Sequence, residues 1–228
     1  MITLNSIKEY SDEDENIIEC AQEYLECKVV FRGKRNVIKI SDGAKLNNVV
    51  VHMDCDDGML IIGAHNKIWT PLKATIRIGH RSKVVIGNNV SSTSSAFISA
   101  VEGANVEIGH DCMFATGITI RSDDSHPIFD VFSGKRINPA RHVKILDHVW
   151  LGDRCSVLSG AMIGEGSVIG LGSIVKGVIP NNCIAVGSPA KVIKKNIAWE
   201  RPHLSLTKPW NKDDSSSITK SLYWNITK

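Results

Sequence analysis

The chain has 228 residues, of which 43% are hydrophobic and 22% are charged, and its formal net charge is +3. No apolar run reaches the length of about 18 residues that a membrane span needs, and the acidic N-terminus lacks the basic-then-apolar pattern of a secretory signal. A net charge so near zero, with no basic block except near the C-terminus, gives no support for nucleic-acid binding.

The cysteines indicate a reducing compartment. None of the six belongs to a CxxC pair, and a domain of this length does not need disulfides as staples. Cys112 and Cys155 are expected to be reduced fillers of a core. We therefore expect a cytoplasmic protein.

Residues 1–36 are expected to form an N-terminal cap, with a helix over Ser11–Cys27. Ser11 suits a helix N-cap, and three acidic residues follow it in the first turn. The apolar residues of this segment would then share one face of the helix. They are Ile17, Ile18, Ala21, Tyr24 and Leu25. An acidic, flexible lead is the alternative.

Residues 37–193 repeat with a period of six, which matches neither a helix nor a plain strand. One column of this repeat is aliphatic: Ile145, Leu151, Val157, Ile163, Ile169 and Val175. Four places later stands a small or β-branched residue: Val149, Cys155, Ala161, Ser167, Ser173 and Ile179. The same frame recurs upstream with interruptions, for example at Ile78 and Ile108.

A hexapeptide period is typical of a parallel β-helix. Each six residues form a short strand and a turn, so that three of them close a triangular coil. Coils stack about 4.8 Å apart, and the count of repeats predicts six or seven coils, on the order of 30 Å in height. The aliphatic column would fill the interior, and the small column would lie near the corners.

Residues 121–144 break the period and are expected to leave the coil as a loop. Their sequence, RSDDSHPIFDVFSGKRINPARHVK, contains two prolines and several charges. Loops on a rigid scaffold often carry function. His126 stands in this loop after Asp123 and Asp124, and a histidine near carboxylates can serve as a general base. A solvated surface histidine is the alternative.

The loop and the repeats that follow it resemble the hexapeptide-repeat acyltransferases, most closely the sugar and capsule polysaccharide O-acetyltransferases. The resemblance covers about Ile98–Lys195 and is most specific at three segments: the His-Pro of the loop, Val-Trp-Leu-Gly at 149–152, and Gly-Ser-Pro-Ala-Lys-Val near the end of the repeats. It implies a left-handed β-helix, which the periodicity alone does not show. It also implies a homotrimer with acetyl-CoA in the cleft between two prisms.

The resemblance further implies roles for individual residues. His126 matches the loop histidine that acts as general base, and Trp150 matches a tryptophan beside the active site, over the acyl or pantetheine region. The remaining matches are to cofactor-binding positions. Gly160, Gly170 and Leu171 would line the pantetheine arm, and Lys176, Lys191 and Lys194 would lie near the phosphates of coenzyme A. The alternatives are a structural corner tryptophan, ordinary turn glycines and solvated lysines.

No metal site is expected. A trimeric β-helix can build zinc sites between subunits from a His-x₄-His pair and a third histidine. His65, His80 and His110 lie near hexapeptide turns, but no such pair exists, since His142 and His148 are six residues apart.

The segment after residue 193 loses the period and contains three of the five tryptophans. We expect residues 194–228 to pack on the β-helix or on a neighbouring subunit. Its aromatic and basic residues could instead edge a carbohydrate groove.

The sequence therefore predicts an O-acetyltransferase that moves an acetyl group from acetyl-CoA to a sugar hydroxyl of a surface or capsular polysaccharide. Two alternatives stay open. The first is an acetyltransferase for another acceptor, such as an amino sugar, serine or a drug. The second is a β-helix that serves as a scaffold without catalysis.

Overall fold

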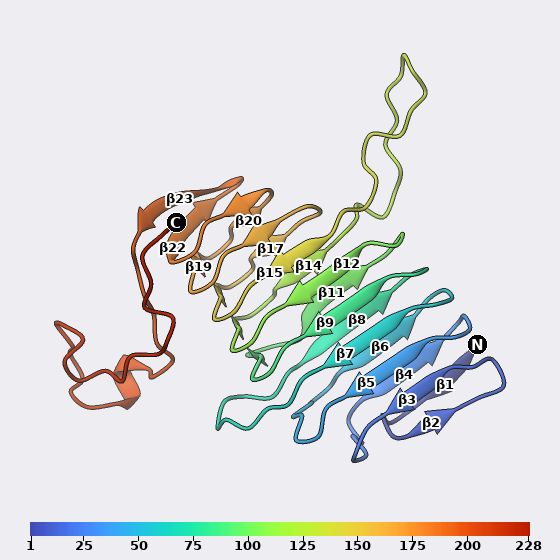
Figure 1. Cartoon of the computed structure of the whole chain (residues 1–228), viewed down its shortest axis with the longest axis horizontal. Helices are drawn as coiled ribbons and strands as arrows, with labels where there is room; N and C mark the ends of the chain where they lie inside the picture. The colour runs from blue at the N-terminus through green and yellow to red at the C-terminus, as the bar shows by residue number, and fades with distance from the viewer.

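The computed structural model describes all residues from Met1 to Lys228. The chain winds into a three-sided β-helix, from which one long loop and the C-terminal tail depart (Figure 1). Its single helical element is the 3₁₀ turn η1 (Leu204–Leu206). No helix is long and apolar enough to cross a bilayer. The predicted all-β coil is confirmed.

Three sheets form the walls of the prism, and successive coils supply neighbouring strands in each. Sheet 1 contains β1 (Ile2–Leu4), β4 (Lys28–Phe31), β6 (Val50–Met53), β8 (Ala74–Ile78), β11 (Ala96–Ala100), β14 (Thr119–Arg121), β17 (Ser156–Val157) and β20 (Ile174–Val175). Sheet 2 contains β2 (Tyr10–Ser11), β3 (Ile17–Glu19), β5 (Val37–Ile40), β7 (Met59–Ile62), β9 (Lys83–Ile86), β12 (Asn105–Ile108), β15 (Val143–Ile145), β18 (Met162–Ile163) and β21 (Val178–Ile179). Sheet 3 contains β10 (Ser91–Ser92), β13 (Met113–Phe114), β16 (Trp150–Leu151), β19 (Val168–Ile169), β22 (Cys183–Gly187) and β23 (Ala190–Lys195).

The pairing is parallel except at the two ends of the prism. Each complete coil visits sheets 1, 2 and 3 in turn, so the corners are named the 1–2, 2–3 and 3–1 corners. Antiparallel pairs β1–β4 and β2–β3 close the N-terminal end, and β22–β23 closes the C-terminal end. These pairs cover edges that would otherwise offer unpaired backbone groups to another chain.

The interior explains the period of six. Every member of the predicted aliphatic column is at most 1% exposed, and each stacks on a residue one coil away, as Ile145 does on Ile163. The small column is buried beside it: Cys155 is 0% exposed and Ala161 is 1% exposed. Cys112 and Cys155 are free and fully buried, as expected, and burial raises the pKa of Cys112 to about 12.

The predicted N-terminal helix is wrong. Asp12 Oδ1 instead accepts hydrogen bonds from the backbone N–H groups of Asp14 and Asn16, both at 3.0 Å, which makes a tight turn. β3 follows this turn and aligns Ile18 with Ile38 of β5. The Ile-Ile-Glu segment alternates between exposed and buried positions with the period of a strand. The coil therefore begins before residue 37, since β3 and β4 already belong to its walls.

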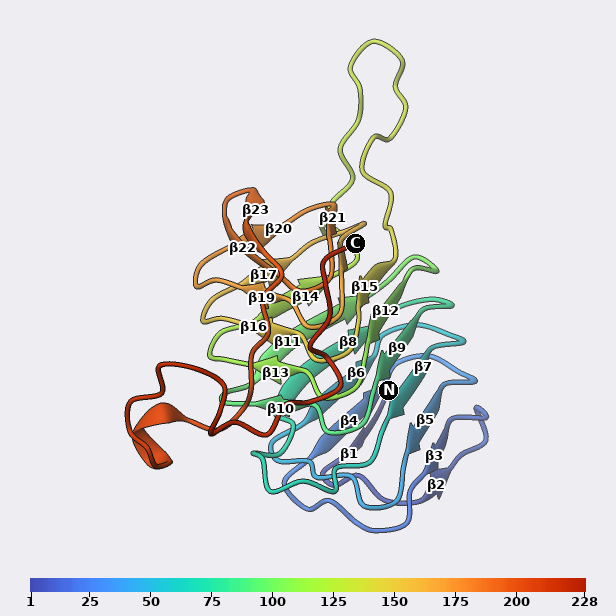
Figure 2. The same ribbon diagram turned by 60° about the vertical axis from the view of Figure 1, so that its left-hand side comes forward.

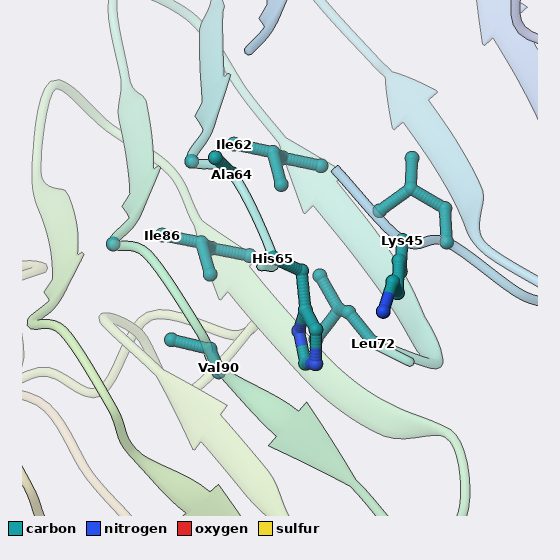
Figure 3. Close-up of a pocket in the computed structure, with 10 residues that line it drawn as sticks. Lys45, Ile62, Ala64, His65, Leu72, Ile86 and Val90 are labelled. Carbon is teal, nitrogen blue, oxygen red and sulfur yellow. The ribbon is translucent and has the colours of Figure 1, made fainter. Parts of the chain in front are cut away.

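Sheet 3 starts only at β10, and the earlier coils cross this side with irregular segments. Leu46 and Leu72 form no more than an isolated bridge there. A small pocket lies at this place, with His65 pointing in from the 63–72 segment (Figure 3). His65 is 3% exposed, and its Nε2 atom has no hydrogen-bond partner. The space of about 10 Å³ holds at most one water molecule, so the pocket is too small for a substrate.

One column of the 2–3 corner has a left-handed backbone in successive coils. Asn89, Asp111, His148, Gly166 and Asn182 have φ of 59°, 55°, 54°, 67° and 50°. Non-glycine residues rarely adopt this conformation, but asparagine, aspartate and histidine are enriched in it. The column therefore places the side chain of His148 in line with those of Asp111 and Asn182.

Candidate active site

The loop of residues 122–142 leaves the prism at the 1–2 corner, between β14 and β15 (Figures 1 and 2). Asp123, which is 4% exposed, fixes its root. The Asp123 carboxylate accepts hydrogen bonds from the backbone N–H of Ser125 at 2.7 Å and from Ser99 Oγ at 3.4 Å. Arg121 lies 3.6 Å from the same carboxylate and donates to Ser125 Oγ at 2.5 Å. This turn sets the direction in which the loop starts.

Asn138 holds the two limbs of the loop together at His126. Its Nδ2 donates to the His126 carbonyl at 2.9 Å and to Asp124 Oδ2 at 3.1 Å, and its Oδ1 accepts from the Ile128 N–H at 2.6 Å. Glu102, on the prism, binds the Arg136 guanidinium at 3.0 Å and thereby ties the returning limb to the wall. The loop is thus braced on both sides of His126.

The His126 ring itself is exposed and receives no hydrogen bond from the chain. The sequence suggested that neighbouring carboxylates orient this ring. Instead, Asp123 and Asp124 bind Ser125 and Asn138 and stabilise the backbone of the loop. The imidazole nitrogens are therefore both accessible to a substrate.

A groove with Trp150 on its wall lies at the 3–1 corner. Its eight lining residues come from three successive coils: Ala115, Trp150, Gly152, Asp153, Val168, Ile169, Gly170 and Leu171. The structure thus brings together three of the predicted site residues, namely Trp150, Gly170 and Leu171. Trp150 is 37% exposed and Leu171 is 64% exposed, so the groove has apolar surface open to a ligand.

The two predicted glycines both have structural reasons to be glycine. At Gly160, φ is +81°, a conformation that a side chain disfavours. At Gly170, an added Cβ would lie 2.5 Å from Val186 Cγ1 in the next coil. Their identity therefore follows from the fold and needs no ligand to explain it.

The three predicted lysines are exposed and form no salt bridge within the chain. Lys176 lines a polar pocket at the 1–2 corner together with Asp124, Asn138 and Arg141 at the root of the loop. Lys191 and Lys194 stand on β23, opposite Val186 and Ile184 of β22. Val186 in turn lies over Gly170, so Lys191 belongs to the end of the prism above the Trp150 groove.

The predicted residues therefore fall into two sets on one chain. His126 and Lys176, with Gly160, belong to the 1–2 corner, whereas Trp150, Gly170 and Leu171 belong to the 3–1 corner. Sheet 1, with β14, β17 and β20, separates the two corners. The pocket at the 1–2 corner contains none of the second set, and the groove at the 3–1 corner contains none of the first.

Two other histidines support the backbone of the coils. His110 Nδ1 accepts from the Asn88 N–H at 2.8 Å, and His142 Nδ1 accepts from the Asn105 N–H at 3.0 Å. No group of three histidine, cysteine or acidic side chains is arranged to hold a metal ion.

Sequence reasoning did not find Asn138 or Arg141, because their roles depend on the shape of the loop. It also did not find Trp199, which is 8% exposed and lies behind Trp150 with the ring centroids 5.9 Å apart. The loss of the six-residue period after residue 193 and the three tryptophans of that segment are the signals in the sequence that it packs differently.

Comparison with known proteins defines the class. No protein-family model matches the chain. It is 32% identical to a polysialic acid O-acetyltransferase of Neisseria meningitidis over 181 residues, which are 74% of this chain and 77% of that protein. It is 41% identical to a polysialic acid O-acetyltransferase of Escherichia coli O1:K1 over 130 residues, 57% of this chain but only 42% of that longer relative.

Two solved structures share the fold over most of the chain. The polysialic-acid-specific acetyltransferase NeuO is 37% identical, with a TM-score of 0.70 over 80% of this chain and 84% of that chain. The polysialic acid O-acetyltransferase OatWY is 28% identical, with a TM-score of 0.61 over 79% of this chain and 94% of that chain.

The chain therefore belongs to the hexapeptide-repeat acyltransferases, and its coil is the left-handed parallel β-helix of that family. Within the family, it is grouped with the sugar and polysaccharide O-acetyltransferases.

Proposed function

We propose that this protein is an O-acetyltransferase that transfers the acetyl group of acetyl-CoA to a hydroxyl of a polysaccharide. The observation that carries the proposal is a free imidazole on a braced loop, in a chain whose prism also has an apolar groove beside Trp150. Its relatives named polysialic acid O-acetyltransferases make a sialic acid polymer the first acceptor to test.

In the proposed reaction, His126 is the general base. Its ring nitrogen takes the proton of the acceptor hydroxyl while that oxygen attacks the thioester carbonyl carbon. The new C–O bond forms, the C–S bond breaks, and the imidazolium returns its proton to the leaving thiolate. A positioned base of this kind contributes about 10²–10⁴ in rate.

Acetyl-CoA would lie along the groove of the 3–1 corner. Trp150 and Leu171 offer apolar surface to the acyl and pantetheine portion, and Gly170 lines the same groove. The exposed ammonium groups of Lys176, Lys191 and Lys194 supply cations for the phosphates. No metal ion enters this scheme.

We propose that a homotrimer joins the two halves of the site. The loop of one protomer would reach the Trp150 groove of its neighbour, which a single chain cannot achieve across sheet 1. The tip of the loop supports this assembly, since Val131 is 88% exposed and Phe132 is 96% exposed. Apolar side chains gathered on a projecting loop are typical of a surface that a partner covers.

The cytoplasm is the proposed location. All six cysteines are free, which suits a reducing compartment. Acetylation would then occur there, before the polysaccharide reaches the cell surface.

The test is an acetyl-transfer assay that follows thiol release from acetyl-CoA with polysialic acid, neutral oligosaccharides, amino sugars and serine as acceptors. We expect release with a sugar polymer, and a fall of about 10²–10⁴ in kcat for His126→Ala with an unchanged melting temperature. Transfer only to an amino sugar or to serine would show that the acceptor is not a polysaccharide. No transfer to any acceptor would favour a scaffold without catalysis.

A further inference from the structure

The C-terminal segment 196–228, here called the strap, lies along the 2–3 corner with two limbs (Figure 2). The outgoing limb contacts more than one coil: the Ile197 N–H donates to the Asn182 carbonyl at 3.0 Å, and Trp199 stacks on His148. The returning limb binds the same corner, where the Tyr223 carbonyl accepts from Asn182 Nδ2 at 2.7 Å. The strap therefore follows the column of left-handed corner residues.

His148 lies between the two limbs. Its ring is 4.0 Å from that of Trp199 and 4.4 Å from that of Tyr223, with interplanar angles of 13° and 7°. Nδ1 is 2.7 Å from Asp111 Oδ2, and Nε2 is 3.0 Å from the Trp199 carbonyl. Each ring nitrogen therefore faces an oxygen atom, one on the coil and one on the strap. The Trp199 indole N–H donates back to the His148 carbonyl at 3.0 Å.

Arg201 anchors the outgoing limb further along the corner. Its guanidinium binds Asp111 Oδ1 at 2.8 Å and Ser91 Oγ at 2.8 Å, and it also donates to the carbonyls of Asp111 and Cys112. The Arg201 side chain is 6% exposed. Asp111 thus joins His148 of the coil to Arg201 of the strap. Two anchors on either side of Trp199 leave its ring little freedom.

Trp199 in turn contacts the groove wall. Its ring lies 5.9 Å from that of Trp150 at a tilt of 47°, a favourable aromatic geometry. Trp150 lines the groove of the 3–1 corner, whereas Trp199 lines no part of it. Trp150 is 37% exposed and is aligned with Met113 and Val168 in the neighbouring strands of its sheet, so Trp199 is the aromatic contact that the chain supplies to its ring.

We propose that the strap is part of the acetyl-CoA site, with Trp199 as a positioning residue that holds Trp150 in the orientation that receives the cofactor and His148 as the residue that holds Trp199. This rests on the proposed function for its kinetic consequence. Its structural consequence, a fixed Trp150 ring, can be measured whether or not the protein transfers acetyl groups.

The structural test uses full-length protein labelled with 5-fluorotryptophan, with the Trp150 resonance assigned from Trp150→Phe. Trp199→Leu removes the ring contact. His148→Asn removes the stacked ring but keeps a residue suited to the left-handed backbone, as at Asn182. We expect both variants to shift or broaden the Trp150 fluorine resonance. Trp210→Leu is the matched control, since Trp210 is 57% exposed and lies on the same strap.

The kinetic test compares KM for acetyl-CoA with kcat in the same variants. Loss of one aromatic contact should raise KM about three- to tenfold in Trp199→Leu and His148→Asn, with kcat within about twofold, and Trp199→Phe should restore most of the loss. An unchanged Trp150 resonance or an unchanged KM overturns the proposal. Should wild-type protein transfer no acetyl group, the proposed function fails, and coenzyme A affinity by calorimetry then replaces KM.

Discussion

Asn138 shows how a single side chain can hold a long loop in one conformation. It binds three groups on the opposite limb of the loop, namely the His126 carbonyl, the Asp124 carboxylate and the Ile128 N–H. These bonds fix the backbone that bears the imidazole while leaving its nitrogens free. The loop backbone therefore has a fixed orientation, and the imidazole of His126 stays accessible to a substrate.

Asn138→Ala should lower kcat about tenfold or more, because a general base that moves from its productive position loses much of its effect. KM for acetyl-CoA should change little, since Asn138 lies outside the Trp150 groove. Steady-state kinetics will measure this. Ser133→Ala serves as the control because it removes a hydrogen bond to Asp130 elsewhere in the same loop. Equal kcat values in the two variants would contradict the prediction that Asn138 positions His126.

Asp111 makes the attachment of the strap sensitive to acid. Burial acts to raise the pKa of this carboxyl, but the hydrogen bond from His148 and the charge of Arg201 outweigh it, and the pKa lies below its ordinary value. The stabilisation is therefore complete above the ordinary aspartate range, near about 4, and is lost as pH falls through the lower folded-state pKa.

Asp111→Asn keeps the corner geometry and removes the charge. We expect a melting temperature below that of the wild type by an amount that is constant near neutral pH and shrinks in acid below about pH 4. Differential scanning calorimetry across this range measures the difference. A gap that stays the same at every pH would show that the charge of Asp111 contributes nothing.

At the scale of elements, the repeats could be predicted from sequence and the segments outside them could not. An aliphatic residue every six positions predicts a three-sided coil, because every third such residue lies over the same position of the preceding coil, as Ile163 lies over Ile145. The N-terminal prediction took Ser11 as a helix N-cap and Asp12 as an acidic residue of the first turn. It failed because Asp12 makes an aspartate turn instead, and the strand that follows pairs Ile18 with Ile38.

The candidate site could be predicted from the sequence only where it stands in a short motif. His126 and Trp150 stand in short motifs that resemble those of a family, so the sequence predicts roles for them, and these roles stay predictions. Asn138 and Trp199 act through contacts with residues 12 and 51 positions away in the chain, as in Asn138 to His126 and Trp199 to His148. Such contacts have no sequence pattern, and only the folded loop and strap show them.

The tip of the loop provides the prediction at this scale. Phe132, which is 96% exposed, should pack against a neighbouring protomer, so Phe132→Asp should weaken the trimer and lower acetyl transfer. Sedimentation velocity at several concentrations will show whether smaller species appear. Lys135→Asp changes charge on the same exposed tip without removing apolar surface and should leave assembly intact. A trimer that is equally stable in both variants would show that the tip of the loop is not part of the subunit interface.

The whole molecule is a rigid prism that carries the halves of a site on different corners. His126, the proposed general base, belongs to the 1–2 corner, the Trp150 groove belongs to the 3–1 corner, and sheet 1 lies between them. Parallel coils packed around a continuous core give no hinge by which one chain could bring the two together. In the proposed homotrimer, the loop of one protomer and the groove of the next would form one site.

Mixing two inactive variants tests whether each active site is formed by two protomers. His126→Ala lacks the base, and Ala115→Trp fills the groove with a ring while Ala115 lies outside the buried core. Each is purified, shown to be inactive alone, and then mixed with the other under conditions that exchange protomers. If each site takes its loop from one protomer and its groove from the next, random mixing should restore about a quarter of the wild-type acetyl transfer. If mixed oligomers form and activity stays at the level of the separate variants, the site lies within one chain and the account is wrong.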